Sequence, residues 1–142
     1  AALMLAIAGP VLFASRTWYP LDYFTAWKPA ERGPYAVRNR NHVDIFDHYL
    51  PMDRAYWSAL HSGEMPWWNP RIVCGHPQHA DFASSVYSPL KLILFRLLPL
   101  VPAHTIYLAL HLFLAGWAMW ELCRRLELSA PASLAGAVGW ML

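Results

Sequence analysis

Charged residues are scarce in this chain. They make up 14% of its 142 residues, whereas an average soluble domain carries about 25%. This scarcity excludes a disordered acidic or basic tail. The apolar residues gather at the two ends of the chain instead of recurring at helical or strand periods throughout, which argues against an ordinary soluble domain.

Cysteine and clustered basic residues are also sparse. The only two cysteines, Cys74 and Cys123, fall on opposite sides of the membrane in the topology given below, so we expect no disulfide between them. The net charge is +2, without the basic stripe that a nucleic-acid-binding protein needs, and nucleic acid is therefore excluded as a partner.

Uncharged apolar runs predict membrane-spanning helices. Residues 105–123 have the length of a complete crossing, because a helix needs about 20 residues to span a bilayer. Residues 1–15 and 131–142 read as a truncated first helix and the start of a third. We therefore expect a fragment of a larger multi-pass protein, with a cleaved signal peptide as the alternative for residues 1–15.

Two adjacent arginines orient these segments. Arg124 and Arg125 directly follow the complete crossing, and basic residues in a short flank favour the cytoplasmic side. Residues 16–104 then form one extracytoplasmic stretch. Within it, residues 90–102 predict a short helix lying in the membrane interface, with Lys91 and Arg96 reaching toward head-group phosphates; a short crossing is the alternative for this segment.

Prolines exclude long helices from most of the outer stretch, apart from one amphipathic candidate at residues 44–62. On that helix Asp44, Asp47 and His48 lie three and four residues apart, so their side chains project from one side. Two carboxylates and an imidazole could act in acid–base catalysis. The alternative is structural: Asp44 caps the helix and Asp47 interacts with the helix dipole. Gly63 is expected to end the helix in a left-handed conformation.

A second polar group follows at residues 74–81, where His76, His79 and Asp81 offer ligand types that zinc and copper use. The paired Cys-x-x-Cys and the His-Glu-x-x-His patterns of common metal sites are missing. A metal-binding outer domain and a polar loop at the membrane surface therefore both remain open. Nearby tryptophans favour an aromatic belt at the membrane interface over sugar stacking.

The order of these motifs resembles one family. The matching residues run from Asp44 and Tyr49-Leu50-Pro51 through Gly63-Glu64-Met65-Pro66-Trp67-Trp68-Asn69-Pro70, Gly75-His76-Pro77, Ala80-Asp81 and Tyr87-Ser88-Pro89 to His111-Leu112-Phe113-Leu114-Ala115-Gly116 and Arg124-Arg125-Leu126. Over residues 40–142 the chain resembles bacterial YfhO-type membrane proteins, which are similar to glycosyltransferases of the GT-C fold. Cys74, His76 and His79 depart from the small or apolar residues expected there.

The resemblance implies an all-α, multi-pass protein of the bacterial cytoplasmic (inner) membrane that transfers a sugar from a polyprenyl-phosphate carrier to a glycan or polymer acceptor in the cell envelope. It implies Asp44 as the catalytic carboxylate, with Asp47 and His48 as neighbours that tune it. Membrane lipids are the other expected partners. The expected substrate-binding residues, which include two cations for the leaving phosphate, are Arg38, Arg40, Trp68, Asn69 and His76.

Two points stay open at the level of sequence. No cofactor is certain and no metal ligand is assigned, although a divalent cation is compatible with the reaction. The alternative function is a non-enzymatic polytopic membrane protein, such as a transporter or an envelope-assembly scaffold. Such a protein would not depend on carboxylates of the outer stretch.

Overall fold

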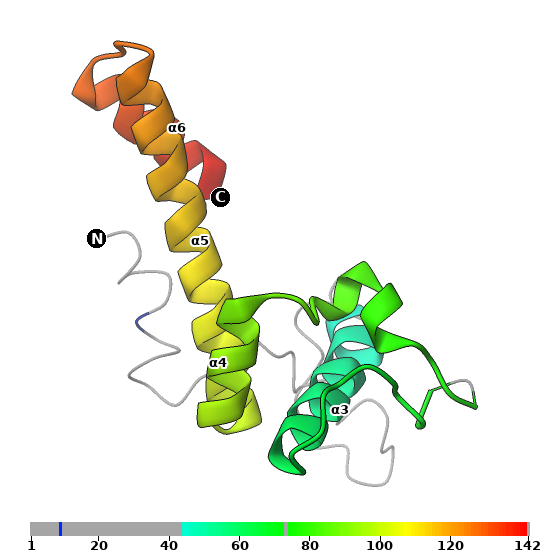
Figure 1. Cartoon of the computed structure of the whole chain (residues 1–142). Helices are drawn as coiled ribbons and strands as arrows, with labels where there is room; N and C mark the ends of the chain where they lie inside the picture. Colours follow the sequence, from blue (N-terminus) through cyan, green and yellow to red (C-terminus); the bar gives the residue numbers. More distant parts are fainter. Residues whose placement is uncertain (1–8, 10–43, 73, 142) are drawn as a thin grey trace, which may run out of the picture.

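The computed structural model describes residue 9, residues 44–72 and residues 74–141, and this part of the chain is mostly helical (Figure 1). The described ranges contain no β-strand, only one isolated bridge between Asn69 and His76. The predicted helical class is thereby confirmed. The predicted first membrane helix at residues 1–15 and the candidate residues Arg38 and Arg40 lie outside the described residues.

The first described helical segment begins with a π-helical turn, η3 (Ile45–Tyr49), and continues directly as α3 (Leu50–His61). Pro51 lies in the first turn of α3, directly after the π-helical turn, and has no N–H to donate to the carbonyls of that turn. The helical segment predicted at residues 44–62 therefore exists, although its first turn is wider than that of an α-helix.

A glycine ends α3 as expected. Gly63 has φ +79°, a conformation that costs glycine little because it lacks Cβ. Its N–H donates to the carbonyl of Leu60, and the N–H of Glu64 donates to the carbonyl of Ala59. These two bonds form a Schellman motif, which satisfies carbonyl groups that the helix end would otherwise leave open.

The segment predicted as one interfacial helix at residues 90–102 consists of two helices. α4 spans Pro89–Leu97, the chain is extended at Leu98 (φ −119°, ψ 155°), and α5 begins at Leu100. Pro99 explains the break, because the residue before a proline is disfavoured in the helical conformation. The short helix therefore ends at Leu97, and the long helix starts earlier than the sequence pattern predicts.

α5 (Leu100–Arg125) is the one helix among the described residues that is long and apolar enough to cross a membrane. Its 26 residues measure about 39 Å at 1.5 Å per residue, more than the roughly 30 Å of bilayer hydrocarbon. Only 17% of its most apolar window is buried within the structure. Such exposure is unlike that of the core helix of a soluble domain.

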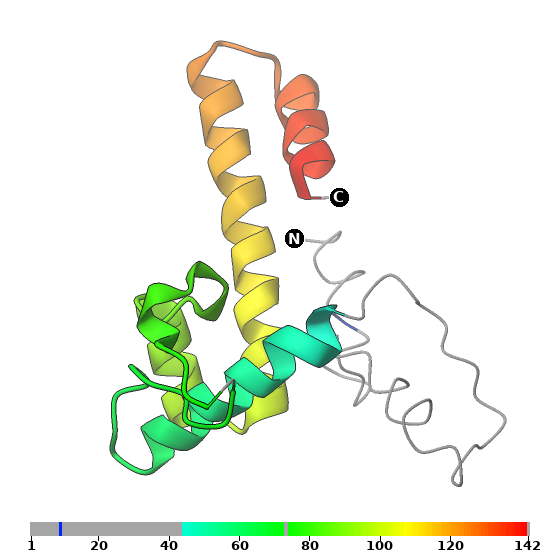
Figure 2. The same cartoon turned by 90° about the vertical axis from the view of Figure 1, so that its right-hand side faces the viewer.

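α6 (Ala130–Met141) folds back along the carboxyl-terminal half of α5 (Figure 2). The two helices approach closely at Gly116, where an added Cβ would lie 2.2 Å from Sδ of Met141, and at Gly136, where it would lie 3.2 Å from Sγ of Cys123. Small residues at these positions therefore allow the hairpin to close.

The hydrophobic core lies at the opposite, amino-terminal end of α5, where α4 packs beside it and α3 runs across it (Figures 1 and 2). Tyr56 and Phe95 are fully buried there, with their rings edge to face at 5.6 Å between centroids. The indole Nε1 of Trp57 donates to the carbonyl of Leu98, 2.9 Å away, between α4 and α5. Three helices are thus fixed at one end of α5.

Candidate functional site

The predicted catalytic group lies on the π-helical turn that precedes α3. Asp44, Asp47 and His48 are all exposed. Asp44 has helical backbone angles and makes no capping hydrogen bond with its side chain, so the structural alternative of an N-cap does not hold. Within the described residues, no ion pair joins the three side chains. Both carboxylates are therefore accessible, and π-helical turns are frequent at functional sites.

The predicted substrate-binding residues Trp68, Asn69 and His76 meet in one loop. The backbones of Asn69 and His76 exchange two hydrogen bonds of 2.8 and 2.9 Å. The indole of Trp68 packs against Gly75, where an added Cβ would lie 2.4 Å from Cζ2 of the ring. Gly75 has φ +120°, so both the backbone and the packing require glycine there. The exposed part of Trp68 is fixed in position by this contact.

The histidines of the same loop bind neighbouring protein groups. Nε2 of His76 lies 3.3 Å from Oδ2 of Asp81, and Nδ1 of His79 lies 2.9 Å from the carbonyl of Trp67. Among the described residues, no three His, Cys, Asp or Glu side chains converge as a metal site would require. The proposed metal site on His76, His79 and Asp81 thus lacks a ligand set in this part of the structure.

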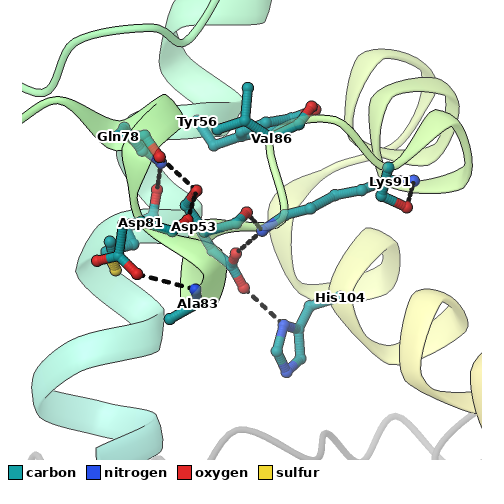
Figure 3. Close-up of polar contacts among 11 residues, drawn as sticks. Asp53, Tyr56, Gln78, Asp81, Ala83, Val86, Lys91 and His104 are labelled. Carbon is teal, nitrogen blue, oxygen red and sulfur yellow. Dashed lines mark hydrogen bonds and ion pairs between the residues drawn. The ribbon is translucent and has the colours of Figure 1, made fainter.

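Among the described residues, a buried polar cluster joins Asp53, Lys91 and His104, which the sequence pattern did not bring together (Figure 3). Asp53 of α3 accepts from Nζ of Lys91 at Oδ1 and from Nδ1 of His104 at Oδ2, both at 2.7 Å. All three side chains are buried. They come from α3, α4 and α5, so this ion-paired cluster joins the three helices where they meet.

Lys91 is turned inward, contrary to the expectation that it reaches toward head-group phosphates. Only 3% of its side chain is exposed. Its Nζ also donates to the carbonyl of Ser84 over 2.6 Å, and it lies 4.9 Å from the ring centroid of Tyr56 and 5.2 Å from that of Phe95. Ion pairing, hydrogen bonding and aromatic faces together compensate for removing the ammonium group from water.

A second layer of hydrogen bonds ties the loop before α4 to the same cluster (Figure 3). Gln78 donates from Nε2 to the carbonyl of Met52, next to Asp53, over 3.0 Å. The hydroxyl of Ser84 contacts the carbonyls of Gln78 and Asp81 at 2.5 and 2.7 Å. Asp81 in turn accepts from the N–H of Ala83. The carbonyl of Ser84 is thereby held in place for Lys91.

The electrostatics of this cluster keep Asp53 ionised. Burial alone would raise the pKa of its carboxyl, but the hydrogen bond from His104 and the positive charge of Lys91 outweigh burial and lower the pKa below its usual value. Burial, with smaller contributions from Tyr107 and Asp53, raises the pKa of Tyr56 to about 12. Tyr56 therefore stays neutral and donates to the carbonyl of Val86 at 3.3 Å.

The cluster and the acidic turn differ in what they can do chemically. A carboxylate that two buried cationic or hydrogen-bonding partners occupy is a weak base and cannot reach an outside substrate. Asp44 and Asp47 are exposed, so a molecule from outside can reach their carboxylates. Asp53 instead fixes the helix that carries them.

A signal for the cluster is present in the sequence. Asp53 lies three and seven residues before Tyr56 and Leu60 on the buried face of α3, and Lys91 lies four residues before Phe95 on the buried face of α4. A charge within an apolar stripe indicates a partner of opposite charge, because an unpaired buried charge is costly. One acid and one base on two such stripes are therefore candidates for a buried ion pair.

The described residues define a mostly helical protein with one helix that could cross a membrane. Comparison with known proteins finds no matching family model, no matching curated protein and no matching solved structure.

Proposed function

We propose that this chain is part of a membrane glycosyltransferase that transfers a sugar from a polyprenyl-phosphate carrier to an acceptor of the cell envelope. The resemblance over residues 40–142 supplies the reaction class. The helical fold and the candidate membrane helix α5 are compatible with that class. The catalytic carboxylate in this proposal is Asp44.

The observation that carries the proposal is an exposed acidic turn on a firmly anchored helix. Asp44 and Asp47 are exposed, while Asp53 of the same helical segment is ion-paired to α4 and α5. His104 lies in the second turn of α5, at the end far from Arg124 and Arg125. With the arginine end in the cytoplasm, the acidic turn is anchored beside the outer membrane surface, where a lipid-linked sugar phosphate lies.

The chemistry assigned to Asp44 is general base catalysis. Its carboxylate takes the proton of an acceptor hydroxyl while that oxygen forms a bond to the anomeric carbon. The bond between this carbon and the phosphate oxygen breaks, and polyprenyl phosphate leaves with the bonding electrons. Base assistance of this kind contributes about 10²- to 10⁴-fold to a rate. Asp47 and His48 tune the base, and the exposed face of Trp68 is available to stack on a sugar ring.

The decisive experiment measures sugar transfer by the full-length protein in proteoliposomes, with a panel of radiolabelled polyprenyl-phosphate sugars as donors. Asp44→Asn is expected to lower transfer by about 10²- to 10⁴-fold while the protein keeps its melting temperature. Glu121→Gln is the matched control, because Glu121 is an exposed acid near the other end of α5. Its transfer rate is expected to equal that of the unaltered protein.

The same experiment separates the alternative functions. Transfer that Asp44→Asn leaves unchanged would remove Asp44 from the catalytic role. If no donor in the panel is used and binding of the donors is also undetectable, the proposal fails as a whole and a non-enzymatic transporter or scaffold becomes the better explanation.

A further inference from the structure

A cleft between the carboxyl end of α3 and α4 is separate from the acidic turn and from the Asp53 cluster. Its volume is about 310 Å³, at the small end of the range for ligand pockets. Its lining residues are Leu60, Gly63, Glu64, Met65, Leu92 and Arg96. Sixteen residues of helix separate Asp44 from Leu60, so the cleft lies roughly 20 Å or more from the proposed catalytic turn.

The cleft contains one charge of each sign between apolar walls. Arg96 is the cation, and its guanidinium donates a short hydrogen bond to the carbonyl of Leu60 at the end of α3. Glu64 is the anion; it is exposed, and no ion pair is formed by its carboxylate within the described ranges. Leu60, Met65 and Leu92 supply the apolar walls. The position of Arg96 is therefore fixed, whereas both charges remain available to a ligand.

The surroundings of the cleft indicate a lipid. Ile93 and Leu97, which follow Leu92 and Arg96 on α4, are 55% and 74% exposed. They lie one turn apart, so they form an apolar strip beside the charged cleft. α4 itself is joined to the candidate membrane helix α5 through Leu98 and Pro99. An apolar strip that continues toward a membrane helix suits acyl chains better than a soluble partner.

We propose that this cleft binds the head group of a zwitterionic phospholipid that carries a primary ammonium group, as phosphatidylethanolamine does. Arg96 pairs with the phosphate and Glu64 with the ammonium. The cleft is too small for a whole lipid, and the acyl chains lie on Ile93 and Leu97. At Gly63, which lines the cleft, a Cβ added to the backbone would meet no atom within 4 Å, so there is open space beside this residue for the head group.

The two charges predict that the cleft selects among phospholipid head groups. A phosphatidylglycerol head group offers the phosphate but no cation for Glu64, so the carboxylate repels it. Phosphatidylcholine offers a cation, but its quaternary nitrogen has no N–H to donate. Phosphatidylethanolamine satisfies both charges with hydrogen bonds, and charge-assisted bonds are the stronger class.

The test is native mass spectrometry of the full-length protein in detergent, with the three phospholipids carrying identical acyl chains. Phosphatidylethanolamine is expected to bind most tightly. Arg96→Gln should weaken its binding about tenfold or more, the effect of losing a hydrogen bond to a charged group. Glu64→Gln should weaken it less and should strengthen binding of phosphatidylglycerol. Arg71→Gln and Glu127→Gln, which alter exposed charges outside the cleft, should leave all affinities unchanged.

Three outcomes would overturn the proposal. Equal binding of the three lipids would contradict the proposed selectivity. If Glu64→Gln binds phosphatidylethanolamine as tightly as the unaltered protein does, Glu64 does not contact the ammonium group. This second outcome can be interpreted even if Arg96→Gln disturbs the end of α3. Displacement of the lipid by free phosphoethanolamine at equal concentration would make the cleft a site for a soluble phosphate ester. All of these readouts concern binding, so they hold whether or not the protein transfers sugars.

Discussion

One helical segment carries carboxylates in two opposite environments. Asp44 and Asp47 lie exposed on the turn before α3, while Asp53 is 6% exposed and contacts two partners at 2.7 Å. The difference separates their roles. The buried carboxylate has its lone pairs and its charge committed to the protein, whereas the exposed ones are accessible from outside.

α4 shows the same division for cations. Lys91 is buried against Asp53 and two aromatic rings, and Arg96 lies exposed in the cleft beside Leu60. Arg96 also contacts α3 through its hydrogen bond to the carbonyl of Leu60, but unlike Lys91 its side chain stays exposed. The separation between structure and chemistry can be tested by changing one member of each pair.

The largest effect is expected when Lys91 is replaced. Lys91→Met keeps the apolar stem but leaves Asp53 without its cation, and removal of one partner from a buried ion pair costs about 3–5 kcal/mol. Thermal unfolding in detergent micelles measures this loss as a lower melting temperature. Asp44→Asn, the exposed counterpart, should change the free energy of unfolding by no more than about 0.5 kcal/mol. Equal losses for the two variants would contradict the division of roles.

The comparison also shows which features the sequence can reveal. Periodicity and hydropathy predict the helical segment after Asp44 and the long apolar helix, and Gly63 predicts the end of α3, because these depend on neighbouring residues. The break at Leu98 follows from Pro99, a local signal that the single-helix interpretation of residues 90–102 ignored.

The buried cluster is harder to predict because its members are far apart in the chain. Lys91 and His104 follow Asp53 by 38 and 51 residues. A charge within an apolar stripe indicates that a partner exists, but no rule about neighbouring residues identifies that partner across three helices. From its position near the end of an apolar run, Lys91 favours snorkelling to the interface. The packing of α3 on α4 places the carboxylate of Asp53 beside Lys91, and this ion pair compensates for burying the ammonium group.

Melting temperatures measured over a range of pH test whether the ionised, buried carboxylate of Asp53 stabilises the fold. Because its pKa is lowered in the folded protein, the ion pair stabilises the fold fully above the pKa of the unfolded chain, about 3.9. The contribution is lost as the pH falls from there through the lower, folded pKa. The gap in melting temperature between the unaltered protein and Asp53→Asn should shrink as the pH falls below about 4. A gap that stays the same from about pH 5 to about pH 2 would show that another group controls stability in acid.

The smallest effect is expected at an exposed ion pair of α5, whose two members lie four residues apart. Arg125 Nε lies 3.4 Å from Oε1 of Glu121, and the side chains are 78% and 53% exposed. Water screens such a pair and its side chains lose entropy on pairing, so Glu121→Gln should lower stability by about 0.5 kcal/mol or less. The loss should disappear in 1 M salt, where the Debye length is about 3 Å, whereas the loss in Lys91→Met should persist because its partner is shielded from solvent ions. The Glu121–Arg125 pair at 3.4 Å is surrounded by water, and the Asp53–Lys91 pair at 2.7 Å is surrounded by protein. The expected difference in their contributions to stability comes more from these surroundings than from the distances.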